Sequence, residues 1–150
     1  MAANICIEDV CNLDWDNDAM KKTTHNPTPW LQGFGLNHAI EVKGGERTLF
    51  CSGQTASDAD GAPLHPGDLV AQYKSAWQCL LDALASAGMD ATNLVRLNFY
   101  VTDVQAFMAA ADQVMPIHGE AGAEIVSTLL GVKELYHPDI MIEIEATAVA

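Results

Sequence analysis

The chain has 150 residues, of which 49% are hydrophobic and 18% are charged. This length and composition suit one domain with a packed core, and they exclude a disordered chain. Lys and Arg number 7 against 20 Asp and Glu, which gives a formal net charge of −13. Because such a charge repels phosphate backbones and anionic lipids, we expect neither nucleic acid nor a membrane as a partner. No apolar run reaches the roughly 18 residues that a membrane-spanning helix needs.

Four cysteines are spread along the chain, at Cys6, Cys11, Cys51 and Cys79. Residues 1–18 lack the basic and apolar regions of a secretory signal, so we expect a cytoplasmic protein whose thiols stay free. A reactive cysteine or a metal ligand is the alternative. No Cys-x-x-Cys pair is present and no His-x₃-His pair follows, so the spacing predicts no metal site.

The first 28 residues are polar and acidic, and we expect them to form an arm or loop with little regular structure. Two β-rich runs follow, at residues 39–42 and 48–51, with the turn signal Gly44-Gly45 between them. The alternation and the glycine pair predict a β-hairpin.

Asp68 is a good N-cap for a long helix that ends at Gly88. Between these residues, apolar side chains recur at i, i+4, i+7 and i+8, which predicts one buried stripe. Residues 94–101 are rich in Val, Leu, Phe and Tyr and predict a strand. Asp103 can then cap a second helix over residues 104–117.

Two strands are predicted near the C-terminus, at residues 126–132 and 140–149. The order β-β-α-β-α-β-β indicates an α+β fold with a sheet backed by two helices. In the last strand, Glu143 and Glu145 share one face and isoleucines the other. If both faces are covered, at least one glutamate is buried or lines a cavity. The alternative is a solvent-facing strand with two solvated carboxylates.

Three separated motifs resemble the Rid (YjgF-type) family, in the order and spacing of that family. They are Leu49-Phe50-Cys51-Ser52-Gly53-Gln54, the strand and cap at residues 94–103, and the final run from Ile142 to Val149. The resemblance covers residues 34–150 as one Rid-like domain and leaves residues 1–33 as an N-terminal arm.

The resemblance implies an α+β, chorismate-mutase-like fold that assembles as a homotrimer, with the sheets forming an inner β-barrel and the helices outside. It implies ligand pockets in the clefts between subunits. The activity best known in the family is hydrolysis of enamines and imines to ketones and ammonia, without a metal or an organic cofactor. The implied partners are a small-molecule substrate and further copies of the chain.

The resemblance marks Ser52, in the family's Ser-Gly-Gln motif, and Glu143, the glutamate that the family uses near the reacting carbon. Imine hydrolysis needs a positioned water, a group that takes its proton and a donor to the leaving nitrogen. Glu143 can be that general base if burial raises its pKa. Ser127, Thr128 or a backbone N–H can stabilise the tetrahedral centre.

Three polar positions of the family's pocket are apolar here. Val126 replaces the arginine that binds the substrate carboxylate, Leu36 replaces a tyrosine, and Ala111 replaces an asparagine; Thr128 stands for a frequent cysteine. Valine cannot supply the bidentate contact that arginine gives a carboxylate. We therefore expect an apolar pocket with Leu36 and Val126 on its walls. Arg96 can take the place of the missing arginine only if its side chain reaches the cleft. Otherwise we expect Arg96 to lie on the surface or at an interface.

Four further residues have two interpretations each. His38 is either a proton shuttle or a hydrogen-bonded strand histidine. Cys51 is either a nucleophile lining the cleft or a buried structural thiol. Asn98 and Tyr100 share one strand face, which either meets a neighbouring subunit or packs within the sheet.

The leading prediction is a cytoplasmic, homotrimeric hydrolase of the Rid type, without cofactor. It acts on a C=N or enamine bond of a small, relatively apolar metabolite, and it is not specific for 2-aminoacrylate. Glu143 activates water in an intersubunit cleft. The alternatives are a non-catalytic trimer that binds a metabolite or regulates a partner, and a tautomerase, cyclase or ring-cleaving enzyme that uses the same cleft. A ribonuclease activity is disfavoured by the acidic charge.

Overall fold

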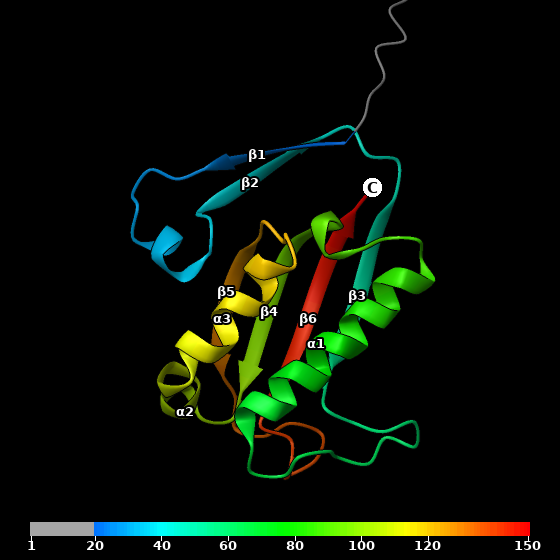
Figure 1. The fold of residues 1–150 in the computed structure, drawn as a ribbon, viewed down its shortest axis with the longest axis vertical. Coiled ribbons are helices and arrows are strands. Elements are labelled where there is room, and N and C mark those ends of the chain that lie inside the picture. Colours follow the sequence, from blue (N-terminus) through cyan, green and yellow to red (C-terminus); the bar gives the residue numbers. More distant parts are fainter. Residues whose placement is uncertain (1–19) are drawn as a thin grey trace, which may run out of the picture.

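The computed structural model describes residues 20–150, in which a four-stranded sheet lies beside a smaller two-stranded one (Figure 1). The strand order of the large sheet is β3-β6-β4-β5. Its strands are β3 (Thr48–Gln54), β4 (Leu94–Val101), β5 (Val126–Gly131) and β6 (Ile142–Val149). β6 runs antiparallel to both of its neighbours, whereas β5 runs parallel to β4.

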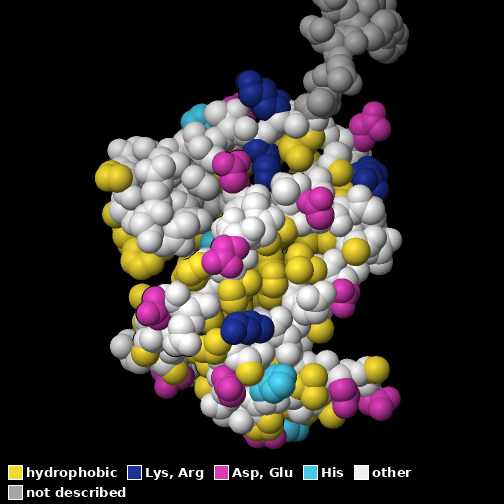
Figure 2. All heavy atoms as spheres, viewed as in Figure 1, with side chains coloured by type: hydrophobic (Ala, Val, Ile, Leu, Met, Phe, Trp, Pro, Cys, Tyr) yellow, Lys and Arg dark blue, Asp and Glu magenta, His cyan; other side chains and the backbone are white. Residues whose placement is uncertain are grey.

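Three helices cover one face of the large sheet and leave the other face open (Figure 1). They are α1 (Leu69–Ser86), α2 (Val104–Ala109) and α3 (Ala111–Glu120). Figure 2 views the molecule from the helix side, where hydrophobic side chains gather between α1 and α3 and acidic ones are scattered around them. The predicted α+β class, a sheet backed by helices, is confirmed.

Helix α1 begins where the sequence predicts. The Asp68 carboxylate accepts a hydrogen bond of 3.0 Å from the backbone N–H of Ala71, an N-cap worth about 1 kcal/mol. After the helix the chain turns at Gly88, whose φ of 69° is costly for other residues. On the buried side of α1, the ring of Tyr73 packs 6.0 Å from the ring of Phe99 in β4.

Strand β6 divides its side chains between the two faces of the sheet. Ile142 and Ile144 are fully buried on the helix side, while Glu143 and Glu145 are half-buried on the open side. Because β6 lies between β3 and β4, it is a central strand and not an edge. The predicted split of the isoleucines and glutamates is confirmed, and the two carboxylates lie in the middle of the open face.

The predicted hairpin is wrong in its pairing. β2 (Ala39–Lys43) pairs antiparallel with β1 (Lys21–His25), whereas β3 pairs with β6. Gly44 and Gly45 have φ values of 66° and 89°, which β-branched or bulky residues avoid. Their backbone directs the chain from the small sheet into the large one and not back onto β2.

Strand β1 also corrects the expectation of little regular structure before the domain. It is fixed to the body of the molecule because the Lys22 ammonium donates to the carbonyl oxygens of Thr92, at 2.6 Å, and Leu94, at 3.1 Å. The predicted domain boundary at residue 33 therefore lies between β1 and β2, which pair with each other. Residues 1–19 of the predicted arm, with Cys6 and Cys11, lie outside the described residues.

The second predicted helix is divided in two. Asp103 caps α2 as expected, since its carboxylate accepts a hydrogen bond of 3.0 Å from the backbone N–H of Ala106. The chain then leaves helical geometry at Ala110, with φ −99° and ψ 3°, before α3 begins. No glycine or proline marks this break, so the apolar pattern does not reveal it.

Candidate active site on the open sheet face

The open face of the large sheet holds most of the reactive side chains that the sequence indicates. Side chains on this face alternate with the core residues of each strand. They include Arg96, Asn98 and Tyr100 from β4, Val126 and Thr128 from β5, and Glu143, Glu145 and Thr147 from β6.

Glu143 lies against the backbone of Gly53 in β3. A methyl group at position 53 would overlap the Glu143 carboxylate, so only glycine leaves this space open. Burial raises the pKa of Glu143, and the negative charge of Glu145 raises it further. Ser52 was the residue of this motif expected in the site, but Gly53 makes the contact with Glu143. A glycine inside a strand is the signal for such a close approach.

Glu145 has the opposite environment on the same strand. Its carboxylate accepts hydrogen bonds from the Tyr100 hydroxyl, at 2.6 Å, and from the Asn98 amide, at 3.1 Å. These bonds lower the pKa of Glu145, and the bond to Glu145 in turn raises the pKa of Tyr100. Two neighbouring carboxyls with pKa values moved apart are an arrangement suited to acid–base chemistry.

A second cluster lies at the other end of the same face. Four candidate site residues of the sequence, His38, Val126, Ser127 and Thr128, line one pocket of about 330 Å³. Arg96 lines the same pocket, so its side chain does reach the predicted binding residues.

The segment before β2 positions His38 at this pocket. The backbone N–H of Asn37 donates to the Ile125 carbonyl at 3.0 Å, just before β5 begins. The backbone N–H of His38 donates to the Asn26 side chain at 2.9 Å. Its ring Nε2 lies 2.9 Å from the Thr28 hydroxyl. The imidazole is therefore hydrogen-bonded and oriented, as the structural interpretation of this histidine requires.

Leu36 lines a different pocket, of about 270 Å³, on the helix side of β5. Its walls are mainly aromatic and aliphatic and include Phe34, Phe99, Phe107, Met115 and Leu129. Ser127 lines both this apolar pocket and the polar pocket of Arg96. In a single chain, Leu36 and Val126 thus lie on opposite sides of strand β5, the edge of the sheet.

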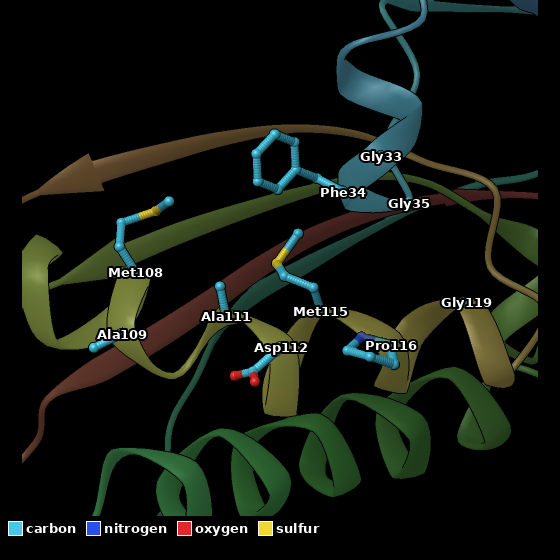
Figure 3. A pocket seen from close by; sticks show the side chains of 10 residues that line it. All are labelled: Gly33, Phe34, Gly35, Met108, Ala109, Ala111, Asp112, Met115, Pro116 and Gly119. Carbon is cyan, nitrogen blue, oxygen red and sulfur yellow. The ribbon is translucent and has the colours of Figure 1, made fainter.

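The apolar pocket adjoins a larger, open depression of about 550 Å³. Figure 3 shows Phe34, from the short 3₁₀ helix η2 (Leu31–Phe34), facing Met108 of α2 and Met115 of α3. The carboxylate of Asp112 points away from these three side chains. The methionines can adjust to ligands of different shape, since their side chains are unbranched and flexible.

Cys51 and Ser52 do not join either pocket. Cys51 is buried on the helix side of β3, and burial raises the pKa of its thiol, which opposes a nucleophilic role. Ser52 is exposed, and its carbonyl accepts a hydrogen bond of 3.0 Å from the Gln54 amide. The geometry therefore favours the interpretation of Cys51 as a buried structural thiol, and it does not place Ser52 at a pocket.

The two clusters are well separated within one chain. Along β4, Tyr100 pairs with Glu143 and Arg96 pairs with Val126, four residues away. At about 3.3 Å per residue this places the two levels about 13 Å apart. A single copy therefore does not bring Glu143 to the pocket of Arg96.

The described part of the chain offers no metal centre. Within residues 20–150, no group of three or more His, Cys, Asp or Glu side chains is placed to hold a metal ion. Cys51 and Cys79 are both free thiols. Among the helices of this part of the chain, none is both long and apolar enough to cross a membrane.

Residues 35–150 match the family model described as Endoribonuclease L-PSP. The chain belongs to this family. The match covers the large sheet, its helices and the pocket that contains Arg96, and it confirms the resemblance to Rid proteins that the motifs indicated.

Solved structures and curated relatives agree with this assignment. A crystal structure from Yersinia pestis, described as a protein of unknown function of the conserved Rid protein family, is 33% identical. It has a TM-score of 0.76 over 86% of this chain and 98% of its own. The YjgF gene product of E. coli, 25% identical, has a TM-score of 0.60 over 68% of this chain and 80% of its own.

Among curated proteins, the goat 2-iminobutanoate/2-iminopropanoate deaminase is 34% identical over 67 residues. A Myxococcus xanthus protein named DfrA is 34% identical over 71 residues. These alignments cover 45% and 47% of this chain. The chain spans about half the length of these relatives, at 49% and 53%.

Proposed function

We propose that this family member is a Rid-type hydrolase of a C=N or enamine bond in a small metabolite, with Glu143 as the group that activates water. The observation that carries the proposal is the pair of unlike carboxyls on β6. Glu143 is half-buried with a raised pKa, and Glu145 beside it is held as an anion by Tyr100 and Asn98. The relatives named as imine deaminases support the same chemistry.

The proposed reaction needs only water and substrate. The ionised Glu143 carboxylate takes a proton from water as the water oxygen bonds to the imine carbon. The electron pair of the C=N bond moves to nitrogen, which receives a proton from the Glu143 carboxylic acid. Transfer of the hydroxyl proton to nitrogen and cleavage of the C–N bond then release the ketone and ammonia. An enamine enters this route after protonation at carbon.

We also propose that the site forms between copies in a cytoplasmic homotrimer whose open sheet faces line an inner barrel. The open face is unsuited to bulk water, because Phe50 on β3 is 78% exposed and Leu130 on β5 is 45% exposed. Association would cover these side chains. It would also bring the Glu143 of one copy towards the pocket of another, which a single chain does not do.

A small molecule is a better substrate for this face than RNA. The description of the family names an endoribonuclease. However, the net charge of −13 on this chain repels the phosphate backbone of RNA. The apolar walls of the Leu36 pocket fit an aliphatic or aromatic group of a metabolite. Within the described residues, no feature specifically favours ring cleavage or cyclisation. Hydrolysis is therefore the function that we propose.

The decisive variant is Glu143→Gln, which keeps the shape of the side chain and removes its base. We expect ketone release from 2-iminobutanoate, or from a neutral ketimine of similar size, to fall about 10²- to 10⁴-fold. Ligand affinity and the mass of the oligomer should not change. Glu134→Gln, in an exposed loop, is the matched control. Equal turnover by the wild type and Glu143→Gln would overturn the proposal. Binding without turnover in the wild type would favour the non-catalytic alternative.

A further inference from the structure

The apolar pocket beside β5 lies on the helix side of the sheet, away from the open face. Strand alternation turns the side chains of Ser127 and Leu129 toward the helices, whereas the side chain of Val126 points to the open face. The pocket of about 270 Å³ is therefore on the other side of the sheet from Glu143 and Arg96, and neither of these residues lines it. What binds there is a separate question from the chemistry of the open face.

The walls of this pocket carry no charge. Its lining side chains are aromatic or aliphatic, with one exception, the hydroxyl of Ser127. Asp112 lines only the adjoining depression, where its carboxylate points away from the apolar side chains (Figure 3). A charged ligand that entered the pocket would lose its water and find no group of opposite charge, which is costly. The pocket is therefore suited to an uncharged molecule.

Two small side chains make the room inside the pocket. Ala111 of α3 and Ser127 of β5 are surrounded by leucine, methionine, phenylalanine and tryptophan side chains. Both are half-buried, so they form part of the inner wall and not only of the rim. The Ser127 hydroxyl can donate and accept a hydrogen bond there. An apolar pocket with a single polar group is the usual composition of a site for a small molecule.

The mouth of the pocket exposes large apolar side chains to water. Trp30 is 63% exposed, Met108 is 46% exposed and Phe34 is 39% exposed. The rings of Trp30 and Phe34 lie edge to face, with their centres 5.8 Å apart. Exposed apolar groups around a hollow mark a binding site, and the flexible methionines can close around a ligand. A ring placed in the pocket would contact these side chains.

We propose that this pocket binds a small uncharged molecule that has one aromatic ring, or an aliphatic group of similar size, and one hydroxyl or carbonyl group. The ring takes the space that Ala111 leaves, and the oxygen forms a hydrogen bond with the Ser127 hydroxyl. The inference goes beyond the proposed function, because it concerns binding on the helix side of the sheet and requires no turnover.

The test uses 2-phenylethanol and two molecules of similar shape. In 2-phenylethylammonium a positive charge replaces the hydroxyl, and in propylbenzene a methyl group replaces it. Affinities are measured by NMR titration of the intact protein with labelled methionine methyl groups. We expect 2-phenylethanol to bind at least about 10-fold more tightly than the ammonium ion, although the net charge of −13 attracts cations. The signals of Met108 and Met115 should shift, and that of the core residue Met89 should not.

Two variants and one control locate the site. Ala111→Leu fills the pocket and should weaken 2-phenylethanol at least about 10-fold. Ala109→Leu adds the same group at an exposed position that lines only the adjoining depression, and it should keep the affinity. Ser127→Ala should weaken 2-phenylethanol about 3- to 10-fold and leave propylbenzene unchanged. Circular dichroism and thermal melting check that each variant is folded.

Four results would each overturn the proposal. They are an absence of 2-phenylethanol binding, an ammonium ion that binds as tightly as the alcohol, an undiminished affinity in Ala111→Leu, and an equal loss for the alcohol and propylbenzene in Ser127→Ala. Because only binding is measured, none of these results depends on the hydrolase activity. A wild type that binds 2-phenylethanol as expected but releases no ketone from an imine would contradict the proposed function and leave this inference intact.

Discussion

The two ends of the open sheet face differ in charge and in the way their side chains are held. At one end, Glu143 lies against Gly53 and beside an anion that is fixed by hydrogen bonds. At the other end, Arg96 takes part in none of the ion pairs within residues 20–150 and lines a pocket together with His38, Val126 and Thr128. The two ends therefore carry opposite charge.

Within a single chain, Glu143 and Arg96 lie at different levels of the open sheet face. About 13 Å along β4 separates the level of Glu143 from the level of Arg96. In a single chain, neither of the two pockets that Arg96 lines includes Glu143. The proposed trimer removes the difficulty, because the acidic end of one copy can meet the basic end of the next. The following changes should affect the two ends unequally.

Among variants that keep both carboxylates of β6, the largest effect on activity is expected from Gly53→Ala. The added methyl group would displace the Glu143 carboxylate from its place beside β3. A displacement of about 1 Å can reduce catalysis about 10²-fold, so turnover should fall by that order while binding at the Arg96 end is retained. Gly119→Ala, where a methyl group meets open space, is the control. Full activity in Gly53→Ala would show that the position of Glu143 is unimportant.

Gln72→Leu should loosen the Glu143 end by destabilising the start of β6. The buried Gln72 amide donates to the Asp139 carbonyl at 2.7 Å and accepts from the Met141 N–H at 2.7 Å. Leucine would leave the Asp139 carbonyl and the Met141 N–H without these partners. The free energy of unfolding, measured with denaturant, should therefore fall by about 2–4 kcal/mol. The exposed Gln78→Leu should change it by less than about 0.5 kcal/mol. Similar values for both variants would contradict this role of Gln72.

Glu145→Gln should change the pH dependence of the reaction. As a base, Glu143 must be ionised, so turnover should rise with pH as its raised pKa is passed. Removing the Glu145 charge removes one cause that raises this pKa. The acidic limb of the kcat profile should therefore move to lower pH, and Glu134→Gln should leave it in place. A shift to higher pH would mean that Glu145 does not act on Glu143 as a neighbouring anion.

Tyr100→Phe should have the smallest of these effects. It removes the strongest hydrogen bond to Glu145, so the pKa of Glu145 should rise toward its ordinary value. Carboxyl NMR titration would detect this change, while ligand affinity at the Arg96 end should stay the same. Tyr136→Phe removes a distant hydroxyl and is the control. An unchanged Glu145 titration in Tyr100→Phe would remove the reason to treat Glu145 as a fixed anion.

Local patterns in the sequence predicted most of the fold. The Asp68 cap, the turn at Gly88 and the alternation in β6 depend on neighbouring residues and were found where expected. The pairing of β2 was missed because its partner β1 is a polar segment held by distant contacts, including the Lys22 ammonium. The break at Ala110 was missed because no residue type marks it.

The candidate site was predicted in part, for the same reason. Glu143 and the cluster of His38 with β5 follow from motifs and strand alternation. The contact of Gly53 with Glu143 and the place of Arg96 beside Val126 depend on the register of strands far apart in the sequence. Spacing along the chain alone does not fix that register.

Whether the two ends form one site between copies is addressed by mixing two impaired chains. Glu143→Gln supplies an intact Arg96 end, and Arg96→Gln supplies an intact Glu143 end. Mixed trimers formed by unfolding and refolding equal amounts together should regain about a quarter of the wild-type activity towards 2-iminobutanoate, since random assembly pairs the two intact ends at that frequency. Each variant refolded alone and assayed at substrate concentrations far below KM should stay well below this level. Mixed samples that remain as inactive as the separate variants, or a wild type that sediments as a monomer, would contradict a site shared between copies.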